Sequence, residues 1–447
     1  AWHPEKGSLY YLSDSSGFYN LRRVPSPVAG SKIIGPGVPI LPQDIDFGGA
    51  APGWTFGQQG HAFLHDGRIA ATFLNKATGT TQLVVFNDPD GADDAASAVA
   101  ESQVLYGPQA GLPPMIGGLK PSPDGTLFFL GGGPDKAACV YAWGGLASQS
   151  ETKEAATELA CSSSNRVPED YVSVPKLMEF PSKHGNAYGY YYPPTNPKAK
   201  SDEKAPPLLV KAHGGPTACT SCAFNPTIQF FTSRGFAVLD VDYGGSTGYG
   251  REYRRRLRKK WGIVDIDDVC AGAQYLVNES LADGSRLAID GGSAGGYTTL
   301  GALAFRDVFT AGCSLYGVAD CSALAQDTHK FESRYLDSLI GKYPEEKALF
   351  DERAPINSVD KLSCPILLLQ GKEDKIVPPN QAEAMYEALK AKSIPTALKI
   401  YDGEQHGFRK SENIEDALNS ELYFYSKVFG FQAAGDEIKP FEIENLQ

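Results

Sequence analysis

One serine of this 447-residue chain lies at the centre of a glycine-rich run, Gly291-Gly292-Ser293-Ala294-Gly295. A G-x-S-x-G run between a strand and a helix forms a sharp turn that exposes the serine oxygen to a base. The flanking residues predict a buried strand at 286–290 and a helix at 297–305. We therefore predict that Ser293 is a nucleophile. An idle serine in a glycine-rich turn is the alternative, because so short a motif also occurs by chance.

A serine nucleophile needs a base, and the base needs an acid that orients it. On a sharp strand-to-helix turn these residues follow one another in the order serine, acid, histidine. Asp374 comes just after a predicted strand at 366–370, and His406 follows the last predicted strand, at 396–401. The sequence therefore predicts Asp374 as the acid and His406 as the base. Glu373 is a competing candidate for the acid.

Acyl transfer also needs hydrogen-bond donors that face the developing oxyanion. The amide of Ala294 directly follows the nucleophile, and a second donor is expected from a glycine-rich loop after an early strand. The run His213-Gly214-Gly215-Pro216 follows a predicted strand at 208–212. We predict that the amides of Gly215 and Ala294 form the oxyanion hole. His213 would brace the loop or be a simple turn residue.

The elements that must position these residues alternate along the second part of the chain. Strands are predicted at 208–212, 236–241, 366–370 and 396–401, and helices between them at 265–277 and 380–392. This alternation predicts a doubly wound, mostly parallel sheet that binds ligands at the carboxyl ends of its strands. We expect an α/β-hydrolase catalytic domain at 170–432 and a C-terminal tail at 433–447.

Residues 1–165 are predicted to form strands throughout. Gly7, Gly67 and Gly125, spaced by 60 and 58 residues, each lie in a tight turn that leads into an apolar strand. A period of this size predicts β-propeller blades, with an ordinary β-sandwich as the alternative. About three blades are fewer than the four to eight of known propellers. We therefore expect a partial β-propeller, further blades upstream or in a second chain or segment, and a processed or truncated protein.

Composition excludes several classes of function. The net charge of −12 argues against nucleic acid as a partner. The sequence has no apolar run long enough for a membrane span and no visible presequence, so a soluble intracellular protein of the cytoplasm or an organelle interior is expected. The eight cysteines are too scattered for a disulfide framework and are interpreted as core thiols. Cys219 and Cys222 lack a second ligand pair, so no metal or other cofactor is predicted. The basic run at 254–260 is interpreted as a solvated helix face.

Taken together, these motifs resemble the prolyl oligopeptidase family of serine peptidases, and most closely its acylaminoacyl-peptidase and dipeptidyl-peptidase-5-like branch. The resemblance rests on six runs in family order: 213–216, 242–250, 261–262, 291–297, 371–379 and 406–408. It implies a propeller joined to the hydrolase domain, and short peptides as substrates. It also implies that Phe331 and Tyr335 border the substrate pocket, with ordinary helix packing as the alternative.

Two departures from the family pattern limit what the resemblance implies. Many relatives carry arginine or asparagine two positions after the catalytic aspartate, where it holds a substrate carbonyl. This chain has Ile376 there, which makes Ile376 a further candidate for the substrate pocket. The paired glutamates with which dipeptidyl peptidases bind an amine are not found. The sequence thus predicts a serine hydrolase that cleaves short peptides through an acyl-enzyme. A carboxylesterase or amide hydrolase acting on small acyl substrates, and a catalytically idle binding subunit, are the alternatives. Homo-oligomerisation is left open.

Overall fold

The computed structural model describes residues 1–3, 5, 7–24, 37–48, 60–87, 103–146, 155–164, 167–199, 201, 204–328, 330–433, 435 and 438–446. The chain folds into two compact units. The N-terminal unit contains Ala1–Leu177, Ser221–Asn225 and Ser246–Arg254, and the α/β unit contains Met178–Thr220, Pro226–Gly245 and Arg255–Gln447. The polar stretch between the two predicted domains, at 148–154, lies outside the described residues.

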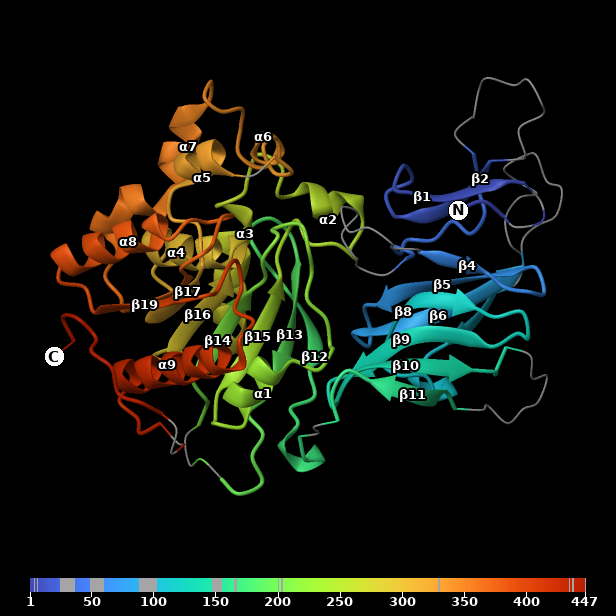
Figure 1. The fold of residues 1–447 in the computed structure, drawn as a ribbon, viewed down its shortest axis with the longest axis horizontal. Coiled ribbons are helices and arrows are strands. Elements are labelled where there is room, and N and C mark those ends of the chain that lie inside the picture. Colours follow the sequence, from blue (N-terminus) through green and yellow to red (C-terminus); the bar gives the residue numbers. More distant parts are fainter. Residues whose placement is uncertain are drawn as a thin grey trace. The chain divides into compact units, whose positions relative to one another are not determined.

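The described strands of the N-terminal unit form three antiparallel sheets (Figure 1). Their orders are β1-β2-β3, β4-β5-β6-β7 and β11-β10-β9-β8. The strands are β1 Leu9–Ser13, β2 Asn20–Val24, β3 Val38–Pro39, β4 His61–Phe63, β5 Arg68–Asn75, β6 Thr80–Asn87, β7 Gln103–Tyr106, β8 Met115–Pro121, β9 Leu127–Gly133, β10 Lys136–Trp143 and β11 Thr157–Cys161.

The three repeated glycines lie in the turns that the sequence predicts. Gly7, Gly67 and Gly125 have φ values of 66°, 83° and 88°, and each comes just before a strand, β1, β5 or β9. The last two turns are closed by matching hydrogen bonds of 3.1 Å, from Gly67 N–H to the Leu64 carbonyl and from Gly125 N–H to the Ser122 carbonyl. A Cβ at Gly67 would meet no atom within 4 Å, so the left-handed backbone, not lack of space, requires glycine there.

A disulfide links two neighbouring strands of the N-terminal unit, which corrects the prediction that the cysteines are core thiols. Cys139 of β10 and Cys161 of β11 are bonded to each other. The antiparallel register places these two residues directly opposite one another. A separation of 22 residues in the sequence gives no sign of this pairing, because it depends on which residues of the two strands face each other.

A short segment from the middle of the chain contributes to the N-terminal unit. Within Ser246–Arg254, the Arg254 guanidinium donates to Asp14 at 2.9 Å and to Asp46 at 2.8 Å. Asp46 also accepts from the amide of Gly250 at 2.9 Å. The prediction of a solvated basic face is therefore wrong at Arg254, whose partners are more than 200 residues away in the sequence.

The α/β unit is built on an eight-stranded mixed sheet in the order β12-β13-β15-β14-β16-β17-β18-β19. β13 pairs with β15 in antiparallel fashion, and the pairs from β15 to β19 are parallel. The central strands are almost continuous apolar runs, as expected for strands covered on both faces. The strands are β12 Lys176–Phe180, β13 Ala187–Tyr192, β14 Leu208–Ala212, β15 Ala237–Asp242, β16 Leu287–Gly292, β17 Ala311–Leu315, β18 Ile366–Gly371 and β19 Thr396–Tyr401.

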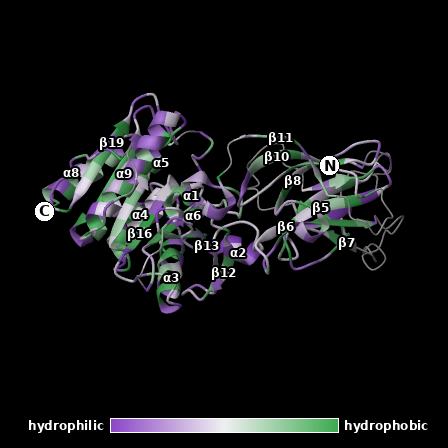
Figure 2. Cartoon of the chain, turned by 90° about the horizontal axis from the view of Figure 1, so that it is seen from below, coloured by the Kyte–Doolittle hydropathy of each residue, from purple (hydrophilic) through white to green (hydrophobic). Residues whose placement is uncertain are grey.

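Helices cover both faces of this sheet. Figures 1 and 2 show α1 and α9 on one face, and α3 and α4, which pack against each other, on the other. Figure 2 also shows hydrophobic strands beneath helices whose outer sides are hydrophilic. The helices are α1 Pro226–Thr232, α2 Arg251–Arg255, α3 Val264–Asn278, α4 Ala294–Phe305, α5 Cys321–Asp327, α6 Leu336–Leu339, α7 Lys347–Arg353, α8 Asn380–Ala391 and α9 Ser411–Phe429.

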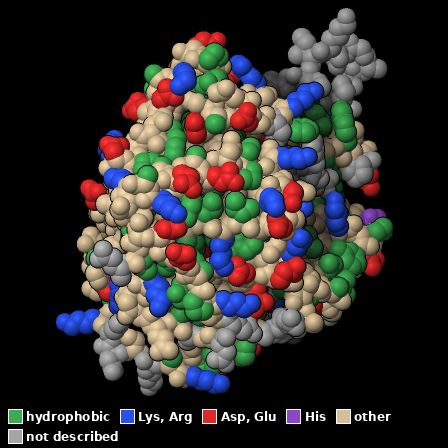
Figure 3. Space-filling model, turned by 60° about the vertical axis from the view of Figure 1, so that its left-hand side comes forward, with side chains coloured by type: hydrophobic (Ala, Val, Ile, Leu, Met, Phe, Trp, Pro, Cys, Tyr) green, Lys and Arg blue, Asp and Glu red, His purple; other side chains and the backbone are tan. Residues whose placement is uncertain are grey.

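The end of the chain returns to the edge of the sheet. Glu444 exchanges two backbone hydrogen bonds with Thr396 of β19 and forms a 2.7 Å ion pair with Lys390. On the face shown in Figure 3, acidic and basic side chains are interspersed. Among the described residues, no helix combines the length and apolar character needed to cross a bilayer.

Candidate active site

Ser293 lies on a tight turn between β16 and α4. Its φ of 59° and ψ of −120° lie in a region that side chains avoid, so the surrounding packing must hold this conformation. Two glycines make that packing fit. A Cβ on Gly291 would come within 2.7 Å of the carbonyl oxygen of Ala212 in β14, and one on Gly295 within 2.0 Å of the same atom. Because the glycines of the motif have no side chain, the turn packs directly against the neighbouring strand, and the serine side chain points away from that strand.

The structure brings the three predicted residues Ser293, His406 and Asp374 into one hydrogen-bonded chain. Nε2 of His406 lies 2.8 Å from Oγ of Ser293, and Nδ1 of His406 lies 2.8 Å from Oδ2 of Asp374. Because a carboxylate accepts, Nδ1 carries the proton and Nε2 is left to accept from the serine hydroxyl. These three groups can therefore move a proton from Ser293 to His406.

Asp374 is held in a turn directly after β18. Its Oδ1 accepts hydrogen bonds from the amides of Ile376 at 2.9 Å and Val377 at 3.0 Å, and its side chain is fully buried. Oδ2 remains directed at His406. The competing acid, Glu373, is exposed and makes a backbone hydrogen bond to Glu404 instead.

The predicted oxyanion loop lies beside the serine. A Cβ on Gly214 would be 3.6 Å from Cβ of Ser293, and both Gly215 and Ala294 line the same pocket as the serine. The ring of His213 braces this loop, since its Nδ1 donates to the carbonyl of Gly214 at 2.8 Å.

The His213 ring is held in turn by Tyr243. The two rings stack with centroids 4.2 Å apart, and the Tyr243 hydroxyl donates to the His213 carbonyl at 2.7 Å. Burial lowers the pKa of His213 to about 4. The ring is therefore neutral near pH 7 and can keep its proton on Nδ1.

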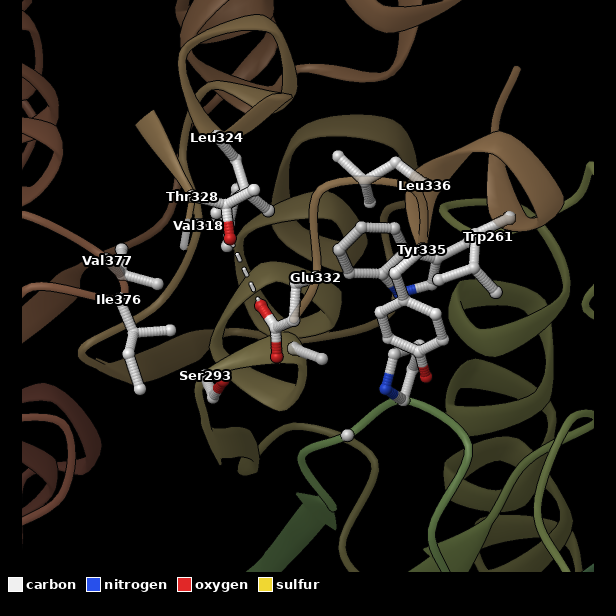
Figure 4. A pocket seen from close by; sticks show the side chains of 14 residues that line it. Trp261, Ser293, Val318, Leu324, Thr328, Glu332, Tyr335, Leu336, Ile376 and Val377 are labelled. Atoms are coloured by element: carbon white, nitrogen blue, oxygen red, sulfur yellow. Dashed lines mark hydrogen bonds between the residues drawn. The ribbon is translucent and has the colours of Figure 1, made fainter. Parts of the chain in front are cut away.

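A mostly apolar pocket opens next to Ser293 (Figure 4). Tyr335 and Ile376, both predicted to border the substrate, line it. The Tyr335 hydroxyl shares a 2.6 Å hydrogen bond with Thr217, which follows the oxyanion loop, and burial raises the pKa of this phenol. The lining residues are Gly215, Pro216, Trp261, Ser293, Ala294, Val318, Leu324, Thr328, Glu332, Tyr335, Leu336, Leu339, Ile376 and Val377.

Phe331 differs from the sequence prediction. Its side chain is 92% exposed, and it is not among the residues that line the pocket. Residues 330–335 form turns that precede α6, so Phe331 and Tyr335 do not share one face of a helix. The expectation from the resemblance therefore fails at Phe331, and the alternative of helix packing fails with it.

Glu332 and Thr328 also line this pocket, and neither was predicted from the sequence. Both lie in the short segment that contains Tyr335, so the segment was found but its polar members were not singled out. The signal that could have identified Glu332 is its position in the sequence between Phe331 and Tyr335, the two residues of this segment already predicted to border the pocket.

No metal centre emerges in the part of the chain that the structure describes. There, the grouping with suitable ligand spacing is Cys139, Glu158 and Cys161, and its two thiols form the disulfide. Cys219 and Cys222 form no disulfide, and burial raises the pKa of the Cys222 thiol to about 11, so that it stays protonated.

Comparisons with known proteins agree with this geometry. Residues 222–432 match the sequence profile of the prolyl oligopeptidase family. Dipeptidyl aminopeptidase BIII of Pseudoxanthomonas mexicana is 31% identical over 229 residues, which are 49% of this chain and 33% of that protein. The acylamino-acid-releasing enzyme of Arabidopsis thaliana is 28% identical over 236 residues, which are 51% of this chain and 31% of that protein.

A solved structure is similar over nearly the whole chain. A puromycin-hydrolyzing peptidase of Mycobacterium tuberculosis aligns with a TM-score of 0.84 and 37% identity, over 98% of this chain and 62% of that one. The chain thus spans about a third of the length of the curated relatives it matches, and less than two thirds of this solved relative.

Proposed function

Residues 222–432 belong to the prolyl oligopeptidase family, and on this premise we propose that the chain is a serine peptidase that hydrolyses short peptides through an acyl-enzyme. The observation that carries the proposal is the hydrogen-bonded chain from Ser293 through His406 to Asp374 at the mouth of an apolar pocket. Names of relatives, among them a puromycin-hydrolyzing peptidase and an acylamino-acid-releasing enzyme, support the same class of reaction.

Ser293 would attack the carbonyl carbon of the scissile bond while its proton passes to Nε2 of His406. The carbonyl oxygen takes up the electron pair and is stabilised by the amides of Gly215 and Ala294. When the tetrahedral intermediate collapses, the C–N bond breaks and His406 gives its proton to the leaving amine. Water then attacks the acyl-enzyme, again with His406 as base, and releases the acid and the free serine.

Asp374 would hold His406 in the tautomer that accepts at Nε2 and stabilise the imidazolium that forms in each step. The buried position of Asp374 and its two backbone donors keep the carboxylate fixed, so the imidazole needs no reorientation between steps. His213 would act one step further away, by holding the loop that carries Gly215.

For the N-terminal unit, we propose that its three antiparallel sheets are blades of a partial propeller. The repeated turns at Gly67 and Gly125, with equal closing distances, support a common blade pattern. The sandwich alternative explains the antiparallel pairing but not this repetition.

Labelling with a fluorophosphonate probe tests the proposed nucleophile. We expect a covalent adduct that mass spectrometry maps to Ser293 and that the Ser293→Ala variant lacks. Ser285→Ala, which changes an exposed serine of the same unit, should be labelled like the unaltered protein. Well-folded protein that reacts with no probe would contradict the proposal.

A further inference from the structure

One tyrosine, Tyr316, lies between the strand that leads to the nucleophile and the strand that leads to the acid. It directly follows β17, which pairs with β16 on one side and with β18 on the other. Its amide donates to the carbonyl of Leu369 in β18 at 2.7 Å, and the carbonyl of Leu315 before it accepts from the amide of Ser293 at 3.0 Å. The backbone at Tyr316 is therefore tied both to the turn of the nucleophile and to the strand that precedes Asp374.

The side chain of Tyr316 packs against the base. Its ring and the imidazole of His406 have centroids 5.1 Å apart and planes inclined by 66°. The centroid of the tyrosine ring also lies 5.3 Å from that of Phe408, in the loop that carries the base. A Cβ on Gly292, the residue before the nucleophile, would come within 2.8 Å of the same ring. Tyr316 thus contacts the segments of all three residues of the hydrogen-bonded chain.

The backbone of Tyr316 adopts a conformation that a side chain disfavours. Its φ is 40°, in the left-handed region that glycine occupies without cost. Such a conformation persists only where the surrounding structure imposes it, and it is found most often at functional sites. The residue that carries this strain is the one whose ring contacts His406. Strain and contact together indicate that the ring is placed for the reaction.

The two hydrogen bonds of His406 leave part of its motion unrestrained. Each ring nitrogen donates or accepts in the plane of the imidazole, so both bonds resist a tilt out of that plane less than a shift within it. The bond to Ser293 is also lost during the proposed reaction, because the serine oxygen has no proton to donate once it carries the acyl group. In the acyl-enzyme, the imidazole is then held by the hydrogen bond to Asp374 and by its packing against Tyr316.

We propose that Tyr316 is a positioning residue for His406, whose ring keeps the imidazole at the angle from which Nε2 faces first the serine and then the water that releases the acyl group. This inference rests on the proposed peptidase function. Because the packing matters most when the bond to Ser293 is lost, removal of the ring should slow deacylation more than acylation. The contacts are made by the ring, so phenylalanine should replace tyrosine without loss.

Hydrolysis of a p-nitrophenyl ester tests the inference, because its leaving group departs easily and deacylation then limits turnover. We expect Tyr316→Leu, which removes the ring, to lower kcat by about 10- to 100-fold, the effect of a small misplacement of a catalytic group. The value of kcat/KM, which reports acylation, should fall less, so KM should fall as well. Acyl-enzyme at Ser293, followed by mass spectrometry after removal of excess ester, should decay more slowly by the same factor as kcat. An unchanged kcat, or a kcat/KM that falls as far as kcat, would overturn the proposal.

Two control variants separate positioning from stability. Tyr316→Phe keeps the ring and should retain the kcat and the acyl-enzyme lifetime of the unaltered protein. Tyr275→Leu makes the matched change at a ring of α3 that packs against Phe180, and it should leave kcat unchanged even where it lowers the unfolding temperature. If Tyr275→Leu slows deacylation as much as Tyr316→Leu does, the role of Tyr316 is structural and the proposal is wrong.

Glycine and alanine at position 316 separate the ring from the backbone strain. Tyr316→Gly accepts a φ of 40° without strain, so it should unfold at a higher temperature than Tyr316→Ala. Both variants lack the ring, and both should lose kcat as Tyr316→Leu does. A glycine variant with the kcat of the unaltered protein would show that the ring is not needed and would contradict the proposal.

A measurement without turnover keeps this inference distinct from the proposed function. The Nδ1 proton of His406, which Asp374 accepts, exchanges with water more slowly when the imidazole is better fixed. We expect NMR to show faster exchange in Tyr316→Leu than in the unaltered protein and in Tyr316→Phe. An unaltered protein that neither hydrolyses the ester nor reacts with a fluorophosphonate contradicts the peptidase, while proton exchange still decides the role of Tyr316. Equal exchange in all three proteins contradicts only the present inference.

Discussion

Two buried histidines, one in each unit, show how differently the units use the same side chain. His61 of the N-terminal unit packs against the rings of Tyr10 and Phe63, and within the described residues neither of its ring nitrogens has a hydrogen-bond partner. His213 of the α/β unit donates to Gly214 and stacks on Tyr243. Burial lowers the pKa of both histidines to about 4.

The comparison separates burial from function. An equal pKa shift arises in an aromatic core and next to the candidate nucleophile, so the shift alone does not identify a working residue. The hydrogen-bond partners do, because they tie His213 to the oxyanion loop and His406 to Ser293 and Asp374. Polar changes in the α/β unit should therefore affect activity, and those in the N-terminal unit only stability.

The largest expected effect is at Asp374. Asn in place of Asp374 can still accept from the backbone amides, but it removes the negative charge and favours the wrong tautomer of His406. We expect kcat to fall by about 10⁴-fold. Steady-state kinetics with a peptide anilide measures this, and unchanged thermal unfolding serves as the control for folding. A loss smaller than tenfold would mean that Asp374 does not orient the base.

Removal of the disulfide should lower the stability of the protein and leave the active site unchanged. Replacing Cys139 and Cys161 with serine opens a loop of 22 residues and should destabilise the N-terminal unit by about 3 kcal/mol. Urea unfolding monitors this loss of stability. Fluorophosphonate labelling of Ser293 should not change, because the three residues of the hydrogen-bonded chain all lie in the α/β unit. A loss of labelling in folded protein would contradict the prediction that the active site does not depend on the N-terminal unit.

Substitution of His61 and His213 tests the comparison between the two units most directly. Between pH 6.5 and about 4, the unfolded chain binds a proton at each histidine that the folded chain does not, so stability falls as the pH falls. At pH 4.5 each histidine should cost about 2 to 3 kcal/mol relative to pH 7. His61→Phe and His213→Phe should each remove this part of the pH dependence in urea unfolding.

The same two variants should differ in activity at pH 7. His213→Phe loses the hydrogen bond to Gly214, and we expect a fall in kcat of about 10- to 100-fold through misplacement of the oxyanion loop. His61→Phe should turn over substrate like the unaltered protein. Equal losses in both variants would contradict the comparison.

The smallest effect is expected at Phe331. Because its side chain is almost fully exposed, Phe331→Ser should change the free energy of unfolding by less than about 0.5 kcal/mol. Tyr335→Phe, the matched change inside the pocket, removes the hydrogen bond to Thr217 and should cost about 1 kcal/mol. Thermal unfolding compares the two. A larger loss from Phe331→Ser would show that this residue is covered in solution.

Much of the α/β unit could be predicted from the sequence, because its signals are local. Apolar runs predicted the strands at 208–212 and 396–401 with the bounds that the structure has. The glycine-rich motif correctly predicted that Ser293 lies between a strand and a helix. Asp374 and His406 follow strands whose carboxyl ends meet at one edge of the sheet. Their proximity to the serine therefore follows from parallel pairing.

The features that escaped prediction depend on contacts between distant residues or on local irregularity. The Cys139–Cys161 pair requires the register of two strands, and the contacts of Arg254 reach back more than 200 residues. Phe331 was misplaced because the resemblance places its segment at the pocket but does not give the direction of each side chain in a run of turns. Glu332 was missed because a single carboxylate in a sequence gives no sign of apolar neighbours brought in by other segments.

The distance along the chain between Ser293 and His406 has a consequence for biosynthesis. The two residues are 113 positions apart, and His406 follows β19, the edge strand of the sheet. A ribosome adds Ser293 first, so a growing polypeptide carries the nucleophile while its base has not yet been translated. The order of synthesis thus delays the proposed hydrolytic activity until 113 further residues have been made and the last strand has joined the sheet.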